Sequence, residues 1–250
     1  MKPIAIIQAR MGSTRLPGKV LKKLNGISVL ECLNNQLNFA SSLNDKIIAT
    51  TLKAEDEILV NFCKANEIKC FRGSENDVLD RYHECAKKFS VDTIVRITSD
   101  CPLIDPKIVD DVIEFYSKNS YDYVNNFFKR TYPYGNDIEI FSFDILNKVW
   151  NKATKQFERE HVTPYIYNNP DAFSIGWIEN KNNLSNFHWT VDRKEDLIFV
   201  QEIFKKISKR PIFLEDIINT INEDPSILEI NKNTNPNEKY LKSIRDEKLK

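Results

Sequence analysis

Short apolar runs rich in β-branched residues alternate with longer stretches of helical apolar spacing over the first 120 residues of the chain. The expected strands are residues 4–7, 46–50, 68–71 and 93–97. The expected helices are residues 28–39, 54–65, 76–89 and 106–118, the last with Asp105 as its N-cap and Pro106 in its first turn. This alternation predicts an α/β fold in which a mostly parallel sheet is covered by helices on both faces.

The pattern becomes mixed α+β beyond residue 120. Strands are expected at residues 121–126, 137–141, 172–178 and 188–191, and helices at residues 143–153, 158–167 and 193–207. A chain of 250 residues can bury one substantial core, so we expect a single domain over residues 1–222, with halves at 1–120 and 121–222. Residues 223–250 are polar with few apolar anchors, which predicts a peripheral tail, partly helical at 238–248.

Charge and cysteine content exclude several classes of protein. The 36 basic and 36 acidic residues cancel, so no overall field attracts the chain to nucleic acid or an anionic membrane, and a phosphate site must be local. The five cysteines have no Cys-x-x-Cys pair and no metal-ligand spacing to the three histidines, which favours reduced, buried thiols. No stretch approaches the ~20 apolar residues of a membrane span and no signal peptide is recognisable, so we expect a cytoplasmic protein.

The first expected strand leads directly into residues 8–19, which we call the phosphate loop. Its sequence is Gln8-Ala9-Arg10-Met11-Gly12-Ser13-Thr14-Arg15-Leu16-Pro17-Gly18-Lys19. Glycines let backbone N–H groups approach phosphate oxygens, and the dipole of a following helix is expected to add to the attraction. Arg10, Arg15 and Lys19 can offset the charge of a triphosphate. A Walker A loop has four residues between its glycines, not five, and a Rossmann fingerprint needs a Gly-x-Gly that the chain does not contain.

Two aspartates are candidate ligands for Mg²⁺, which prefers one or two protein carboxylates together with phosphate oxygens and water. Asp100 follows the expected strand at 93–97, so we expect it at the carboxyl end of a central strand, facing the phosphate loop. Asp192 ends the expected strand at 188–191 and precedes a helix. Taken alone, Asp192 is equally consistent with an ordinary helix N-cap.

Five stretches of the chain resemble, in order, the motifs of one family. The phosphate loop is similar to the signature loop of the sugar nucleotidyltransferases. The likeness continues through residues 77–82 (Asp-Val-Leu-Asp-Arg-Tyr), 95–105 (Val-Arg-Ile-Thr-Ser-Asp-Cys-Pro-Leu-Ile-Asp), 159–163 (Arg-Glu-His-Val-Thr) and 190–197 (Thr-Val-Asp-x-x-Glu-Asp-Leu). Within that family the chain resembles the SpsF-type cytidylyltransferases of spore-coat polysaccharide synthesis, which are related to the Kdo and acylneuraminate cytidylyltransferases.

The resemblance implies a fold and an activity. The fold would be a Rossmann-like nucleotide-diphospho-sugar transferase (GT-A-like) three-layer sandwich, with residues 1–120 binding the nucleotide and residues 121–222 the acceptor. The activity would be Mg²⁺-dependent transfer of CMP from CTP to a sugar or sugar acid, with release of pyrophosphate, for surface polysaccharide or glycoconjugate synthesis. Members of the family are often homodimers, so a homodimer is expected here.

The resemblance also implies roles for particular residues. Asp100 and Asp192 would bind Mg²⁺ and, with Arg10 and Lys19, form the catalytic set. The nucleotide-binding set would be Gln8, Ala9, Arg10, Gly12, Ser13, Arg15, Lys19, Asp77, Arg81, Arg96 and Asp100. The acceptor-binding set would be Tyr134, Asp137, Glu139, Arg159 and His161. From the residues alone, Asp77, Arg81 and Arg96 are equally consistent with structural ion pairs, and His161 with a histidine on a helix surface.

Three alternatives to this interpretation are open. A GT-A-type glycosyltransferase usually has an Asp-x-Asp motif, which this chain does not contain. A catalytically silent module is disfavoured because the cations of the phosphate loop and both aspartates are present together. The third alternative is a nucleotidyltransferase that uses another nucleoside triphosphate with a sugar or polyol phosphate as acceptor. His188 and Trp189 differ from the basic and aliphatic residues expected before the Thr190-Val191-Asp192 motif, which leaves the acceptor open.

Overall fold

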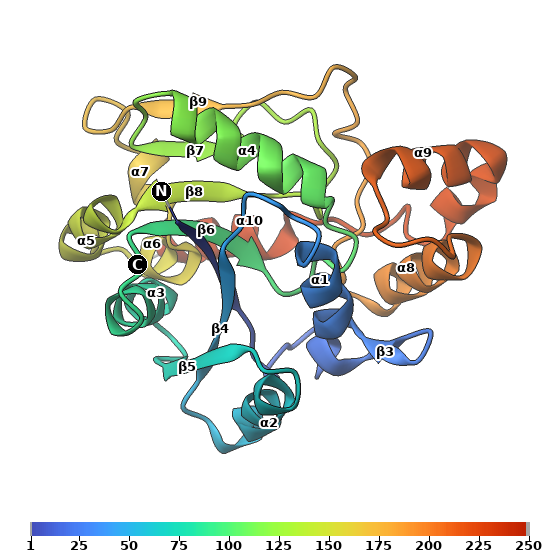
Figure 1. Cartoon of the computed structure of the whole chain (residues 1–250), viewed down its shortest axis with the longest axis horizontal. Coiled ribbons are helices and arrows are strands. Elements are labelled where there is room, and N and C mark those ends of the chain that lie inside the picture. Colours follow the sequence, from blue (N-terminus) through green and yellow to red (C-terminus); the bar gives the residue numbers. More distant parts are fainter. Residues whose placement is uncertain (1, 249–250) are drawn as a thin grey trace.

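A seven-stranded sheet forms the centre of the computed structural model, which describes residues 2–248 (Figure 1). Its strand order is β5-β4-β1-β6-β8-β7-β9. The strands are β1 (Pro3–Gln8), β4 (Asp45–Thr51), β5 (Lys69–Gly73), β6 (Thr93–Thr98), β7 (Tyr123–Asn125), β8 (Glu139–Ser142) and β9 (Ile175–Trp177). β8 runs antiparallel to its neighbours β6 and β7, whereas the other paired strands run parallel. The predicted mostly parallel sheet and mixed second half are therefore confirmed.

Helices cover both faces of this sheet. One face packs on α1 (Val29–Leu37), α2 (Glu57–Ala65) and α4 (Pro106–Lys118), and the other on α3 (Val78–Lys88), α5 (Phe143–Lys152), α6 (Gln156–His161) and α7 (Pro164–Tyr167). Figure 1 shows α4 in front of the sheet and α6 behind it. The side chains alternate between the two cores along each strand, so Ile7 and Val95 face α1 and α4 while Ile6 and Ile94 face α3.

A third apolar cluster lies beyond the end of the sheet. It joins the hairpin β2–β3 (Lys23–Leu24 and Ile27–Ser28) to α8 (Lys194–Lys206), α9 (Leu214–Glu223) and the 3₁₀ helix η3 (Pro225–Glu229). α9 was not among the expected elements, although Ile217 and Ile221 have helical spacing and are buried. Ile227 is buried in the same cluster, so the first part of the expected tail is anchored, and α10 (Glu238–Lys248) follows it. The domain boundary at residue 222 stays a prediction.

Three local predictions were wrong. Residues 188–191 form no strand; this segment makes a single β-bridge from His188 to Tyr134. The expected helix at 158–167 is split into α6 and α7, because Val162 has a φ of 75° and Pro164 starts a new helix. No α-helix follows the phosphate loop directly: the chain enters the three-residue 3₁₀ helix η1 (Lys19–Leu21) and the β2–β3 hairpin before α1 begins, so the expected helix dipole is not at the loop.

The cysteines are free thiols, and all but Cys70 are buried, as predicted. Between residues 2 and 248, no helix has both the length and the apolar character needed to cross a membrane.

The remaining short element is the 3₁₀ helix η2 (Ala54–Asp56), which leads into α2.

Gly135 combines a left-handed backbone conformation with a close neighbour. Its φ is 103°, and a Cβ atom there would lie 2.6 Å from the ring of Trp189. Gly26 has a similar φ of 93° but open space around it. We expect Gly26→Ala to lower the free energy of unfolding by about 1–3 kcal/mol through backbone strain. Gly135→Ala should cost about 1–3 kcal/mol more because it also overpacks the Trp189 site. Equal losses in urea unfolding would contradict the close approach to Trp189.

Candidate active site

The strand register brings the phosphate loop and Asp100 to the same edge of the sheet. β1 and β6 are adjacent and parallel, and Gln8 is paired with Thr98. The phosphate loop therefore leaves β1 at the level where Ser99 and Asp100 leave β6. The carboxyl edge of a parallel sheet is where open α/β folds bind ligands.

Asp192 reaches this edge through a backbone contact between distant segments. The amide of Val191 donates a hydrogen bond of 2.8 Å to the carbonyl of Asp100. The segment is aligned by two further bonds, from the amide of Tyr134 to the carbonyl of Phe187 and from the amide of Trp189 to the carbonyl of Tyr134. The two predicted metal ligands are therefore adjacent, although the predicted strand that carries Asp192 does not form.

Lys19 lies between the two carboxylates. Its Nζ atom is 2.6 Å from Oδ2 of Asp100 and 2.7 Å from Oδ1 of Asp192. Arg15 also reaches Asp192, at 2.8 Å. The Lys19, Asp100 and Asp192 side chains are 13–20% exposed, so these pairs are partly shielded from water. We call Arg15, Lys19, Asp100 and Asp192 the charge cluster.

Within the charge cluster, the pKa values of Lys19 and Asp100 shift in the directions that favour their ionised forms. Burial alone would lower the pKa of Lys19, but the charges and hydrogen bonds of Asp100 and Asp192 outweigh burial and raise that pKa to about 12. Burial would likewise raise the pKa of Asp100, but the ammonium of Lys19 lowers it. Both carboxylates contact the same ammonium group. Mg²⁺ is commonly bound by one or two such carboxylates.

The fit to Mg²⁺ rests on this donor set. Within residues 2–248 no group of three or more His, Cys, Asp and Glu side chains is arranged to hold a metal ion. Asp100 and Asp192 form a set of two carboxylates, and the ammonium of Lys19 shows that one cation can contact both. Two carboxylates completed by phosphate oxygens and water suit Mg²⁺, and they do not suit an all-protein zinc site.

The rest of the phosphate loop is held by acidic residues that sequence reasoning missed. The amide of Met11 donates to Oδ1 of Asp56 at 2.7 Å, and Arg10 lies 3.5 Å from Glu75. The hydroxyl of Ser13 accepts from the amide of Leu16, which closes a local turn. Asp56 is buried beside the phosphate loop. In the sequence it lies just before α2, and nothing at that position indicates a contact with the loop.

The other predicted nucleotide ligands lie in structural contacts. Asp77 caps α3 through the amide of Asp80, and its other oxygen pairs with Arg159 at 2.6 Å. Arg81 is 2% exposed and donates to the carbonyl of Ser74. These contacts give Asp77, Arg81 and Arg159 an evident role in the fold, and their role in binding stays a prediction.

Arg96 and Glu139 form a buried ion pair across the β6–β8 ladder. The guanidinium of Arg96 also donates to the side-chain oxygen of Gln8 at 3.2 Å. Oε1 of Glu139 accepts from the hydroxyls of Tyr123 and Thr163. Gln8 and Arg96 thus lie together at the edge where β1 and β6 end, whereas Glu139 is 2% exposed and enclosed by its partners.

Two of the remaining acceptor candidates, Tyr134 and His161, are contacted by the C-terminal segment. The hydroxyl of Tyr134 accepts from Asn237, and His161 lies 2.8 Å from the hydroxyl of Ser243. Asp137 forms two hydrogen bonds with Arg130, whose guanidinium stacks 3.7 Å from the Tyr134 ring centroid. The segment before α10 and α10 itself therefore border the acceptor side that the sequence predicts.

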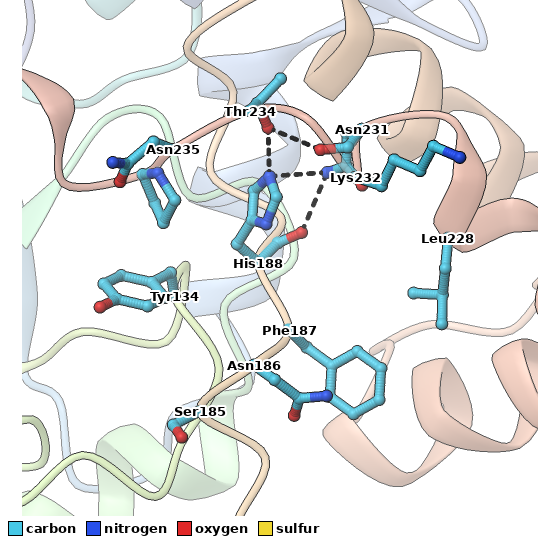
Figure 2. A pocket seen from close by; sticks show the side chains of 11 residues that line it. Tyr134, Ser185, Asn186, Phe187, His188, Leu228, Asn231, Lys232, Thr234 and Asn235 are labelled. Carbon is cyan, nitrogen blue, oxygen red and sulfur yellow. Dashed lines mark hydrogen bonds between the residues drawn. The ribbon is translucent and has the colours of Figure 1, made fainter.

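A cavity of about 390 Å³ opens beside Tyr134 and His188 (Figure 2). It lies between the loop at residues 185–188 and the segment at residues 228–236. Its lining is mostly polar and includes the side chains of Asn231, Thr234 and Asn235. Figure 2 shows His188 at its wall, hydrogen-bonded to Thr234 and Asn231.

The fold is that of the nucleotidyltransferases, and the charge cluster lies at the carboxyl edge of its sheet. The chain belongs to the cytidylyltransferase family, whose sequence model matches residues 4–238. It is 32% identical to the spore coat polysaccharide biosynthesis protein SpsF of Bacillus subtilis, over 88% of this chain and 94% of that protein. The predicted family is therefore confirmed.

Solved structures agree with this assignment. A cytidylyltransferase from Leptospira borgpetersenii has a TM-score of 0.89 and 34% identity, over 94% of this chain and 98% of that one. CMP:2-keto-3-deoxy-manno-octonic acid synthetase complexed with CTP has a TM-score of 0.64 at 16% identity, over 82% and 99% of the two chains. The latter likeness shows the same fold.

Glu139→Gln tests whether this residue supports the fold or binds acceptor. Removing one charge leaves the guanidinium of Arg96 buried without its counter-ion, and breaking such a pair costs about 3–5 kcal/mol. Glu114→Gln is the matched control, because Glu114 pairs with Lys118 on the exposed face of α4 and should change stability by less than about 0.5 kcal/mol. Thermal unfolding measures both. A Glu139→Gln protein of normal stability would contradict the structural role.

Proposed function

We propose that the chain transfers CMP from CTP to a sugar or sugar acid and releases pyrophosphate. The observation that carries the proposal is the charge cluster, in which a lysine of the phosphate loop contacts two carboxylates from separate segments at 2.6 and 2.7 Å. Membership of the cytidylyltransferase family supports CTP as the donor. The name of the SpsF relative supports a role in polysaccharide synthesis.

In this reaction an oxygen of the acceptor attacks the α-phosphorus of CTP. The bond from that phosphorus to the bridging oxygen of the β-phosphate breaks, and the acceptor hydroxyl loses its proton. Arg10, Arg15 and Lys19 offset the charge of the triphosphate and of the departing pyrophosphate. Lys19 can exchange its carboxylate partners for phosphate oxygens, since both are anionic.

Asp100 and Asp192 would hold Mg²⁺ in this proposal. The ion would supply a positive charge that polarises the phosphate and lowers the pKa of the attacking hydroxyl. The side chains of Gln8 and Arg96, which lie together beside the phosphate loop, would orient the nucleotide. Tyr134, Asp137 and His161 would border the acceptor. A cytoplasmic location and a homodimer remain predictions from the sequence.

Pyrophosphate release from a panel of substrates tests the donor and the acceptor. CTP, UTP, GTP and ATP are each supplied with Mg²⁺ and with a series of sugar acids, sugar phosphates and polyol phosphates. We expect release with CTP and a sugar or sugar acid, and loss of that release when EDTA removes the metal. Release with another nucleotide would correct the base but keep the reaction class. No release with any combination would reject the proposed activity.

Asp100→Asn tests the metal ligand. Removing one of two converging carboxylates should lower kcat by about 100-fold or more, because the charge on the transferring phosphate is no longer neutralised in place. Asp45→Asn is the matched control: Asp45 lies at the opposite, amino edge of the sheet and pairs with exposed Lys69. Initial rates at saturating CTP compare the two variants. Near-normal turnover of Asp100→Asn would remove this residue from the reaction.

A further inference from the structure

A buried carboxylate lies directly beneath the turn that carries Asp192. Asp196 is the third residue of α8 and is 2% exposed. Its Oδ2 atom accepts from the amide of Arg193 at 2.8 Å and from the amide of Asp192 at 3.1 Å. The backbone on both sides of the Cα atom of Asp192 is therefore tied to one carboxylate oxygen.

The other oxygen of Asp196 is tied to the C-terminal part of the chain. Its Oδ1 atom accepts from the hydroxyl of Thr234 at 2.8 Å and lies 3.3 Å from Nε2 of His188. Asn231 in turn donates to the carbonyl of His188 at 3.2 Å. Figure 2 shows Thr234 and Asn231 both hydrogen-bonded to the same nitrogen of the His188 ring. Asp196 thus joins the Asp192 turn to residues 231–234 through partly buried hydrogen bonds.

We propose that Asp196 is a positioning residue for Asp192, and that Thr234 and His188 link residues 231–234 to this role. The inference rests on the proposed function, in which Asp192 holds the metal ion. Asp192 must point at the place where Asp100 also points, because Lys19 contacts both carboxylates. Hydrogen bonds that orient a metal ligand are worth about 10- to 100-fold in metal affinity or activity.

An ordinary helix cap would have the same local geometry, and the chain contains one for comparison. Asp216 is the third residue of α9, and its Oδ2 atom accepts from the amide of Phe213 at 3.0 Å. Its other oxygen pairs with the exposed lysine Lys209, which is not a member of the charge cluster. Asp196→Asn and Asp216→Asn therefore remove the same kind of cap, but only the first touches the Asp192 turn.

Mn²⁺ binding in the presence of CTP, followed by electron paramagnetic resonance, tests the inference without turnover. The Mn²⁺ affinity of Asp192→Asn gives the effect of removing the proposed ligand itself, with which the other variants are compared. We expect Asp196→Asn to weaken Mn²⁺ binding about 10- to 100-fold and to lower kcat more than it raises KM for CTP. Asp216→Asn should lower thermal stability and leave Mn²⁺ binding as in the wild type.

Two outcomes overturn the inference. If Asp192→Asn weakens Mn²⁺ binding while Asp196→Asn matches Asp216→Asn, Asp196 is an ordinary cap and the proposed function stands. If Asp192→Asn binds Mn²⁺ like the wild type, the metal assignment fails and the inference fails with it.

Thr234 provides a second test that keeps Asp196 in place. Thr234→Val removes the hydroxyl at nearly constant shape, and Thr234→Ser retains it. We expect Thr234→Val to weaken Mn²⁺ binding several-fold, by loss of one hydrogen bond, and Thr234→Ser to restore it. Equal binding by the valine and serine variants would show that residues 231–234 have no part in positioning Asp192. This pair also answers the question if Asp196→Asn does not fold.

Discussion

The ammonium group of Lys19 lies between two carboxylates, one from the turn after β6 and one from the turn before α8. Two carboxylates this close to a common point repel one another unless a cation lies between them. Lys19 supplies that cation, and Arg15 adds a second contact to Asp192. The phosphate loop thereby joins the parallel half of the sheet to the turn before α8. The Val191–Asp100 hydrogen bond and the apolar contacts of Leu16 and Leu103 with the third cluster support the same arrangement.

The first half of the fold follows from local signals in the sequence. Strand and helix periods alternate over residues 4–118, and the residues that end β1 and β6 begin the phosphate loop and the Asp100 turn. Parallel neighbours end at one edge, so the approach of these segments is predictable. The second half depends on contacts between distant segments. The segment of Asp192 has apolar strand character but is aligned by single hydrogen bonds to Tyr134 and Asp100, which no periodicity reveals.

The predicted site residues also differ in whether local sequence or distant contacts determine their environment. Lys19 and Asp100 were predicted from their chemistry and their place in the first half of the chain, and Asp192 was predicted from the family resemblance. The structure brings the three side chains together. Arg96 and Glu139 also have the right chemistry, but their mutual pairing depends on the β6–β8 register. The ion pair between Asp77 and Arg159 likewise depends on distant segments, because Asp77 caps α3 and Arg159 lies in α6. A charged residue in a family motif can therefore serve either the fold or the site, and its partner in the structure is needed to distinguish the two roles.

The hydrogen bond from Val191 to Asp100 has a consequence for how activity is acquired during folding. The phosphate loop and Asp100 belong to the parallel strands formed by the first half of the chain, whereas Asp192 arrives from a segment far along the sequence. Contacts of high sequence separation pay the larger loop-closure entropy and form slowly. A refolding chain in which only the β1–β6 region is ordered has one converging carboxylate and no second. Under the proposed function, the helical circular dichroism of α1 to α4 returns before catalysis, because catalysis also requires the Asp192 segment to dock.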